Sequence, residues 1–367
     1  MSVVIALDSF KGSLRAADAC AAVAEGWRDV DPDAVIVLRP MADGGEGTLA
    51  AFAAAVPGAE PMPVRVAGPD GARIDAAWLR LPPAPDAPGG TGVVELASTS
   101  GIELLHGRLL PYDASTRGFG EAIAAALDHG VDRLVLGIGS SASTDGGVGL
   151  LTALGARFAD AAGAAAPPGL RGVERLATVD LAGLRPLPPG GAVVLSDVRA
   201  PLLGPGGAAA VFGPQKGLRE IDAADAALAR LAGLLPADPQ TPGAGAAGGA
   251  GFGLLAWGAV LVPGAPEVAR LVDLAGAVAG ASCVITGEGR YDAQSATGKA
   301  PGFVADLAAA RGVRAALVAG DIRASTERFA DAIALTELAG SAEAALAEPS
   351  RWLRAAGREL AARTRLA

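Results

Sequence analysis

Cysteine, histidine and aromatic side chains are scarce in this chain, and each shortage excludes a class of protein. Among its 367 residues there are two Cys, two His and 4% aromatics. Two cysteines cannot form a disulfide framework, and without a Cys/His cluster no zinc site is expected. Cys20 and Cys283 each lie in an apolar run, so both are interpreted as buried. Any bound metal is expected to be a hard cation held by carboxylates.

Basic residues are fewer than acidic ones. The chain has 30 Lys and Arg and 39 Asp and Glu, which gives a net charge of −9. Such an acidic surface repels nucleic acid and anionic membranes, so neither is expected as a partner. No basic segment precedes the apolar run Val3–Leu7, so a signal peptide is not predicted. The uncharged stretch 239–266 is broken by Gly and Pro, which argues against a lipid-spanning helix. We expect a cytoplasmic protein that acts on small molecules.

The length and the order of apolar runs predict two domains of α/β class. Strand-like and helix-like segments alternate at both ends of the chain, which indicates a parallel sheet. We expect a flavodoxin- or Rossmann-like parallel-sheet domain built from residues 1–60 and 264–367. A second α/β domain is expected to be inserted between them, over residues 61–263. Two consecutive domains are the alternative, because a single sequence does not show the strand order.

Several elements are predicted with definite bounds. A turn signal, PDGA, separates two apolar segments and indicates an antiparallel hairpin. The helical pattern continues without a break over four further stretches, and one apolar strand is expected to end in a Gly-rich loop. The predictions are a hairpin of 64–67 and 74–81, helices over 117–129, 147–158, 266–279 and 341–365, and a strand 283–286 followed by a loop.

Lysine is the rarest basic residue, and its three positions are informative. Of the 30 Lys and Arg only Lys11, Lys216 and Lys299 are lysines, and they lie in the Gly-bearing segments SFKGS, GPQKG and TGKAP. A compact ammonium suits a single phosphate or carboxylate oxygen better than a planar guanidinium does. We therefore predict binding roles for Lys11 and Lys299, whereas for Lys216 chance placement is an equally good explanation.

Acidic residues follow the predicted strands within a few positions. In open α/β sheets ligands bind beyond the carboxyl ends of the strands, so these carboxylates could converge. In MADGGEG and STDGG an Asp precedes a Gly pair, a pattern in which backbone N–H groups face a phosphate while carboxylates hold Mg²⁺ through water. For each single Asp, a helix N-cap is the alternative. The acids are Asp8, Asp43, Asp145, Asp197, Glu288 and Asp292.

Two familiar nucleotide-binding signatures were tested against the sequence. A P-loop is absent, because Ala293 stands where the first glycine before Gly298-Lys299 would be. A G-x-G-x-x-G/A match at 137–142 follows a predicted strand, which would suit an NAD-dependent oxidoreductase. Asp145 would repel a pyrophosphate there unless a cation intervened, so a magnesium–phosphate turn is favoured. A second match, at 243–248, follows a loop instead of a strand.

Six motifs in order resemble the bacterial glycerate kinases over essentially the whole chain. They are LDSFKGS, PMADGGEGT, GIGSSASTDGG, DVRAPLLGPGGAAAVFGPQKG, PGAGAAGGAGFGLL and GEGRYDAQSATGKAP. The resemblance implies phosphorylation of D-glycerate by ATP with Mg²⁺, most often to 2-phosphoglycerate. It also implies a flavodoxin-like domain of discontinuous segments, an inserted domain and a site between the two. Whether the protein forms a homodimer is left open.

The chain departs from the family pattern at a few motif positions. Ser140 replaces a usual glycine, Thr144 and Ala200 replace usual asparagines, and Arg117 lies where Tyr-Gly-Thr-Gly is more common. The chain contains no Asn at all, so two of these changes fit general usage. They equally fit an altered substrate, a related small hydroxy acid, or a catalytically inactive relative.

The resemblance and the needs of phosphoryl transfer together assign roles. Lys11 and Lys299 are expected at ATP phosphates or the substrate carboxylate, Asp43 and Asp197 at Mg²⁺, and Asp197 or Asp292 as the base. The turns 139–147 and 243–251 are expected to supply backbone N–H donors. The remaining predicted binding residues are Ser9, Gly44, Gly45, Ser141, Gly146, Gly147, Lys216, Gly287, Glu288 and Arg290.

Overall fold

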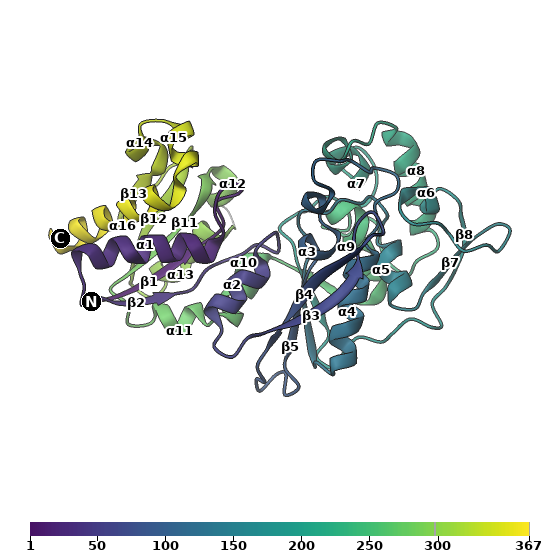
Figure 1. The fold of residues 1–367 in the computed structure, drawn as a ribbon, viewed down its shortest axis with the longest axis horizontal. Coiled ribbons are helices and arrows are strands. Elements are labelled where there is room, and N and C mark those ends of the chain that lie inside the picture. Colours follow the sequence, from purple (N-terminus) through teal and green to yellow (C-terminus); the bar gives the residue numbers. More distant parts are fainter. Residues whose placement is uncertain (297–298, 367) are drawn as a thin grey trace. The chain divides into compact units, whose positions relative to one another are not determined.

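The computed structural model describes residues 1–296 and 299–366, and the chain divides into two compact units. Unit 1 comprises Met1–Asp43, Ala50–Pro57 and Pro263–Ala367. Unit 2 comprises Gly44–Leu49 and Gly58–Val262. Residues 44–49, which fall within the predicted first domain, therefore cluster with unit 2. Figure 1 follows the chain through both units.

Unit 1 is built on a five-stranded parallel sheet. Its strands are β1 (Ser2–Leu7), β2 (Val35–Leu38), β11 (Cys283–Tyr291), β12 (Arg314–Ile322) and β13 (Asp331–Ala334), in the spatial order β13-β12-β11-β1-β2. All four pairings are parallel. Counted within the unit this order is 2-1-3-4-5, that of flavodoxin-like sheets, whose strand order reverses between the first and third strands. In unit 1 the reversal lies between β1 and β11.

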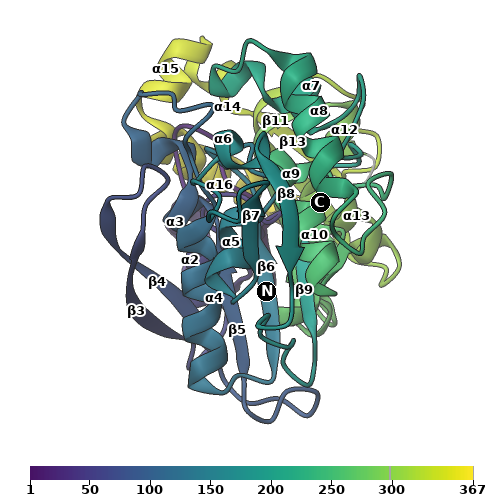
Figure 2. The ribbon, with the colours of Figure 1, turned by 90° about the vertical axis from the view of Figure 1, so that its right-hand side faces the viewer.

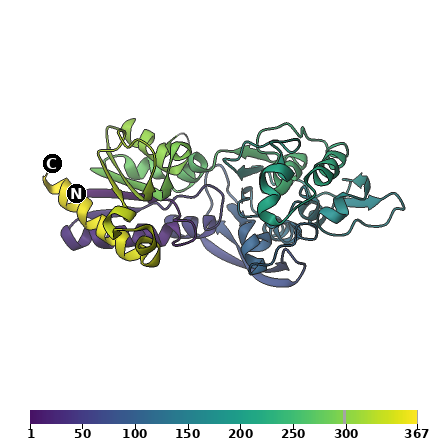
Figure 3. The ribbon, with the colours of Figure 1, turned by 90° about the horizontal axis from the view of Figure 1, so that it is seen from above.

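Helices cover both faces of the unit 1 sheet. Alternate residues of β1, namely Val3, Ile5 and Leu7, share a core with α1 (Ala16–Val30) and α16 (Pro349–Leu366). Seen from above, these purple and yellow helices lie together on one side and light green helices lie on the other (Figure 3). The other helices of the unit are α10 (Gly264–Leu271), α11 (Leu274–Val278), α12 (Ala293–Ala296), α13 (Ala300–Ala309), α14 (Leu335–Ala339) and α15 (Ala342–Ala347).

Unit 2 contains a mixed six-stranded sheet in the order β10-β9-β6-β5-β4-β3 (Figure 2). The antiparallel part is β3 (Glu60–Ala67), β4 (Arg73–Leu81) and β5 (Thr91–Glu95). The parallel part continues from β5 through β6 (Arg133–Gly137), β9 (Ala192–Leu195) and β10 (Val260–Val262). A separate antiparallel pair consists of β7 (Arg157–Asp160) and β8 (Leu176–Asp180).

The helices of unit 2 enclose one apolar core, in which Phe119 and Ile123 of α4 meet Trp78 and Val94 of the sheet. Their bounds are α3 (Ala97–Ser100), η1 (Ile102–Leu105), α4 (Arg117–His129), α5 (Val148–Ala153), α6 (Leu170–Val173), α7 (Ala208–Phe212), η2 (Pro214–Lys216), α8 (Ile221–Ala232) and α9 (Ala246–Trp257). Helix α2 (Thr48–Ala55) begins in unit 2 and ends in unit 1. Over the residues described, no helix is long and apolar enough to cross a membrane.

The predicted α/β class with parallel sheets is confirmed, as are the hairpin and the helix 117–129. The helix predicted over 147–158 is wrong after Ala153, because Gly155 takes a φ of 110° and the chain enters β7. The helix predicted over 266–279 is divided at Asp273, whose φ is 48°. The stretch 341–365 is likewise two helices, because α15 ends before Pro349 begins α16.

The loop predicted after residue 286 is also wrong. Strand β11 continues through Gly287 and Glu288 to Tyr291, paired with β12 as far as Ile322. This extension places Glu288 within a strand instead of in a loop.

Candidate active site

Three carboxylates of unit 1 gather at the carboxyl ends of neighbouring strands. Asp8 follows β1, Asp43 comes after β2, and Glu288 lies in β11. Backbone pairing continues past the strands, because the Asp8 N–H donates to Gly287 O at 2.8 Å and the Met41 N–H donates to Leu7 O at 2.8 Å. The group therefore lies where the strand order reverses, which is the usual ligand position in such sheets.

The carboxylates interact through their charges. Burial raises the pKa of Asp8 well above its ordinary value of 3.8, and the negative charges of Asp43 and Glu288 raise it further. The Ser9 N–H, 2.6 Å from Oδ1, and the Lys11 ammonium act in the opposite direction. Burial also raises the pKa of Glu288, against a hydrogen bond from Ser295 and the charge of Lys299. The three acids thus repel one another and favour a cation.

This donor set fits Mg²⁺ held partly through water. In the described part of the chain, Oε1 of Glu288 is buried and has no hydrogen-bond partner. Among those residues no three His, Cys, Asp or Glu side chains are arranged to hold an ion by themselves. Mg²⁺ usually takes one or two carboxylates and keeps several waters and phosphate oxygens, so a complete protein cage is not required. Asp43 is the predicted ligand among these three, and Asp8 and Glu288 are further carboxylates whose charges interact with it.

Both predicted lysines of unit 1 stand beside these acids. Lys11 is exposed in a tight turn, in which the Leu14 N–H donates to Phe10 O at 3.0 Å. Lys299 is the N-cap residue of α13. A cation is unfavourable at a helix N-terminus, whose partial charge is positive, and the negative charge of Glu288 compensates for this at Lys299. The roles of the two lysines as phosphate or carboxylate ligands stay predictions.

Other predicted residues of unit 1 have structural contacts. Oδ1 of Asp292 accepts the Ser295 N–H at 3.2 Å, so Asp292 caps α12. A Cβ on Gly287 would lie 1.6 Å from Val318 O, which explains the glycine by packing against β12. Arg290 is exposed on β11. Catalytic and binding roles for these residues, and for Ser9, remain predictions.

In unit 2 the turn after β6 is held by Asp145, which is fully buried. Its carboxylate accepts hydrogen bonds from the Thr116 N–H at 2.8 Å, the Gly147 N–H at 3.2 Å and the Gly149 N–H at 3.3 Å. Thr116 Oγ1 donates to it as well, at 2.9 Å. These contacts do not support the magnesium–phosphate role expected for Asp145. Its oxygens instead accept the N–H groups at the start of α5.

The two Gly-rich segments of unit 2 pack on each other. The Gly146 N–H donates to Gly248 O at 3.1 Å, and a Cβ on Gly248 would lie 2.1 Å from Ser143 O. Gly147 and Gly253 also approach closely, with 3.0 Å between a Cβ on the first and Cα of the second. The N–H groups of Gly146 and Gly147 both donate inside the unit. A ligand-binding role for them stays a prediction that these contacts do not support.

The other Gly pair of the prediction, Gly44 and Gly45, packs at the carboxyl edge of the unit 2 sheet. A Cβ on Gly44 would lie 2.4 Å from Leu195 O, and Gly44 O accepts the Gly139 N–H at 2.9 Å. Asp197, exposed two residues after β9, lies at this edge also. Its predicted roles as base and magnesium ligand stay predictions.

Sequence reasoning missed Glu95, the last residue of β5. Its carboxylate is 4% exposed and accepts the N–H groups of Gly47 and Leu49, each at 3.0 Å. Glu95 thereby fixes the segment that begins at Gly44. The available signal was an acidic residue at the end of an apolar strand, the same signal that identified Asp8 and Asp197.

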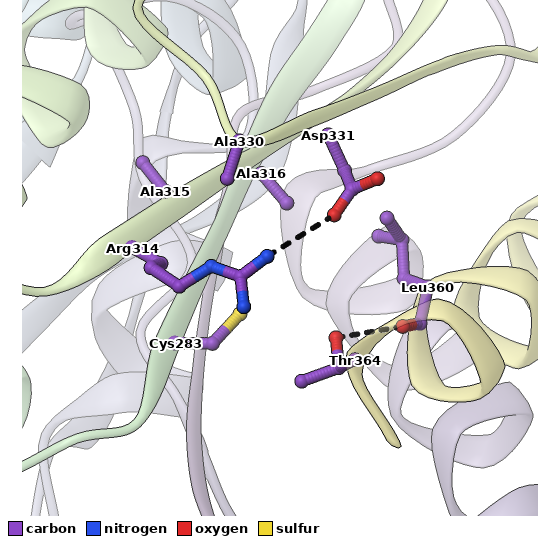
Figure 4. A pocket seen from close by; sticks show the side chains of 8 residues that line it. All are labelled: Cys283, Arg314, Ala315, Ala316, Ala330, Asp331, Leu360 and Thr364. Atoms are coloured by element: carbon purple, nitrogen blue, oxygen red, sulfur yellow. Dashed lines mark hydrogen bonds and ion pairs between the residues drawn. The ribbon is translucent and has the colours of Figure 1, made fainter. Parts of the chain in front are cut away.

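Two cavities are lined by residues other than Asp8, Asp43 and Glu288. One, of about 10 Å³ and room for one water, lies in unit 1 beside Cys283 and Arg314 (Figure 4). These residues begin β11 and β12, at the sheet edge opposite Glu288. The second, of about 230 Å³, lies in unit 2 between Glu95 and Ser140.

Comparison with known proteins places the chain in a family. The family described as the Glycerate kinase family matches residues 3–365. The chain belongs to the glycerate kinase family. The predicted resemblance is confirmed, and the chain is a phosphotransferase with an alcohol group as acceptor. The family match decides against the oxidoreductase alternative.

Bacterial members of the glycerate kinase family are similar to this chain over most of its length. Glycerate 2-kinase of Escherichia coli (strain K12) is 40% identical over 318 residues, covering 84% of this chain and 82% of that protein. Glycerate kinase of Bacillus subtilis (strain 168) is 39% identical over 332 residues, covering 88% and 85%. The crystal structure of a protein assigned as glycerate kinase 2 from Salmonella typhimurium LT2 matches with a TM-score of 0.84 and 36% identity, covering 100% and 98%.

One departure from the glycerate kinase pattern has a visible physical consequence. Ser140, where the family usually has glycine, takes a φ of 59° in the left-handed region. A side chain there is strained, because Cβ crowds the following carbonyl oxygen. The substitution therefore costs stability locally.

Proposed function

We propose that this protein transfers the γ-phosphoryl group of ATP to a hydroxyl of D-glycerate and yields 2-phosphoglycerate. The acid and lysine cluster of unit 1, in a chain matched to the family from residue 3 to residue 365, carries the proposal. A relative named Glycerate 2-kinase at 40% identity supports the 2-phosphate as the product.

The proposed chemistry needs charge neutralisation and positioning more than covalent catalysis. Mg²⁺, when bound, would neutralise phosphate charge, and Asp43 with Asp8 and Glu288 would hold it. Lys11 and Lys299 bind phosphate or carboxylate oxygens as point charges. Asp197 is the proposed base and takes the proton from the reacting hydroxyl of glycerate, and Asp292 is the alternative.

A direct assay tests the reaction and its product. The protein is incubated with Mg-ATP and D-glycerate, and products are identified by ³¹P NMR. A 2-phosphoglycerate resonance that requires both substrates supports the proposal. A 3-phosphoglycerate resonance corrects the position of transfer, and ATP consumption independent of glycerate overturns the function.

The departures at Ser140, Thr144 and Ala200 favour one additional test. Related small hydroxy acids are compared with D-glycerate at equal concentration, by release of ADP. We expect the highest kcat/KM for D-glycerate. A tenfold or greater preference for another hydroxy acid would reassign the substrate and keep the enzyme class.

Two variants test the proposed roles. Asp197→Ala should lower kcat by about 10²- to 10⁴-fold with an unchanged urea unfolding midpoint, as expected for loss of a general base. Near-normal kcat would contradict the base and metal roles. Lys11→Arg keeps the charge but not the shape, so kcat/KM should fall by about tenfold or more. Wild-type kinetics for Lys11→Arg would contradict the argument from lysine usage.

A further inference from the structure

A lysine ammonium is buried beneath the turn that follows β6. Lys216, the last residue of η2, is 2% exposed. Its Nζ donates to Ser141 Oγ at 2.6 Å and to Ser143 O at 2.5 Å. Both acceptors belong to the turn between β6 and α5, so one side chain from a distant segment fixes two points of it.

This ammonium is not explained by stability. Burial lowers the pKa of Lys216 from 10.5 to about 7, and the nearby charge of Asp145 only partly offsets this. A buried charge with incomplete compensation destabilises a fold compared with an apolar residue of similar size. The presence of lysine at this position therefore calls for a role other than packing.

The contact determines what the Ser141 hydroxyl can do. A hydroxyl offers one donor and two acceptor lone pairs, and the hydrogen bond that Lys216 Nζ donates to Ser141 Oγ uses one of these lone pairs. Within residues 1–296 and 299–366 the Ser141 hydroxyl has no other hydrogen-bond partner. Its proton is thereby left to donate to an oxygen from outside the protein.

Ser141 stands close to where ligands bind in such sheets. It follows β6, whose carboxyl end neighbours those of β5 and β9. Its backbone pairs with that of Gly101, which lines the cavity of about 230 Å³ together with Ser140.

We infer that Lys216 is a positioning residue, which holds the turn after β6 from beneath and directs the Ser141 hydroxyl as a donor to an anionic oxygen of the substrate or nucleotide. This inference rests on the proposed function. Lys216 was predicted to bind the ligand directly, and we infer instead that it acts on the ligand through Ser141. Lysine suits the position because its compact ammonium reaches two acceptors at different angles.

A double-mutant cycle tests the inference. Lys216→Met keeps the length of the side chain and removes the donor, and Ser141→Ala removes the hydroxyl. Each should lower kcat/KM by about 10- to 100-fold, the range for one hydrogen bond to a charged oxygen, and the double variant should be no worse than either. Losses that multiply would show independent roles and overturn the inference.

Ser143→Ala is the matched control, because it removes a neighbouring hydroxyl and leaves the carbonyl contact with Lys216. Its effect should combine multiplicatively with that of Lys216→Met. Urea unfolding separates positioning from folding, since Lys216→Met removes a buried charge and should not lower the midpoint. If the urea midpoint of Lys216→Met fell far enough for unfolding to explain the lost activity, the inference would be overturned.

Binding measurements keep the test independent of turnover. The same cycle is measured calorimetrically on the Kd of Mg-ATP and of D-glycerate. Coupling in either constant supports the inference even if wild-type protein fails to phosphorylate glycerate, which would overturn the proposed function alone. Additivity in kcat/KM and in both Kd values overturns the inference, and wild-type protein that binds neither ligand overturns both.

Discussion

The tripeptide Asp-Gly-Gly occurs at residues 43–45 and again at 145–147, and the two aspartates have opposite surroundings. Asp43, in unit 1, is half-buried and its charge raises the pKa of Asp8. Asp145, in unit 2, is fully buried and accepts N–H groups from Thr116, Gly147 and Gly149. A carboxylate close to other carboxylates is stabilised by a bound cation, whereas a carboxylate that accepts several hydrogen bonds from the protein stabilises the fold. The same local sequence thus contributes to a carboxylate cluster in one unit and to a hydrogen-bonded turn in the other.

Among the variants that bear on this comparison, the largest expected effect is the loss of turnover in Asp43→Asn. Removing one carboxylate of the acid cluster should lower kcat by about 10²- to 10³-fold, the range for one group that stabilises transition-state charge. Asp29→Asn is the matched control, because Asp29 is exposed and its pKa is lowered to about 2 chiefly by its hydrogen bond with Arg354. Steady-state kinetics should show the control unchanged. Equal kcat in both variants would contradict a binding role for the acid cluster of unit 1.

Next in size is the destabilisation expected for Asp145→Asn. The new amide N–H₂ would face either the Gly147 N–H at Oδ1 or the Thr116 and Gly149 N–H groups at Oδ2, so the free energy of unfolding should fall by about 3 kcal/mol. Urea unfolding measures this, with Asp180→Asn as the control, since among the described residues the Asp180 carboxylate accepts only the exposed Ala182 N–H, at 2.9 Å. Activity per folded molecule should change little. A stable but inactive Asp145→Asn would instead place Asp145 in the chemistry.

A smaller, pH-dependent effect is expected for Asp8→Asn. Between 3.8 and its raised pKa, folded Asp8 binds more protons than unfolded Asp8, so wild-type stability falls as pH rises through that window. Asn cannot ionise, so the variant should be more stable than wild type by about 1 kcal/mol near neutral pH. Urea unfolding from about pH 4 to about pH 8 should show the gap widening with pH. A gap that narrows would show that Asp8 is stabilised as a carboxylate.

The smallest expected effect is a gain in stability for Ser140→Gly. Glycine adopts the observed φ of 59° without strain, and after its larger unfolded-state entropy is included, we expect about 0.5 to 1 kcal/mol. Thermal unfolding would show a modest rise in Tm. Ser98→Gly, within α3, should have the opposite sign because glycine weakens helices. A fall in Tm for Ser140→Gly would mean that the serine side chain makes a compensating contact.

The sequence singled out the acids of unit 1 because each lies within a few residues of an apolar strand, and it singled out Lys11 and Lys299 because lysine is rare in this chain. Asp8 and Asp43 needed only the position of the strand before them. Glu288 was identified by the same rule, although its strand was expected to end before it. The segment GEGRY has little strand propensity by itself, and it is extended because β12 pairs with it as far as Tyr291.

Unit 2 was harder to predict because its contacts join segments far apart in the chain. Gly147 and Gly253 approach across more than a hundred residues, and Lys216 reaches Ser141 across 75. A Gly-rich stretch is equally typical of a phosphate turn and of close backbone packing. Glu95 escaped notice for a similar reason, since its partners Gly47 and Leu49 precede it by more than forty residues.

By itself the sequence determined the α/β class, the family and the residue types at the carboxyl ends of the strands, because apolar periodicity and motif order are local properties of the chain. Only the tertiary structure decided which of those side chains stay unsatisfied and which are used within the fold. Whether a carboxylate or an ammonium has partners depends on residues that folding brings to it from elsewhere, and the burial that shifts its pKa exists only once the layers have packed.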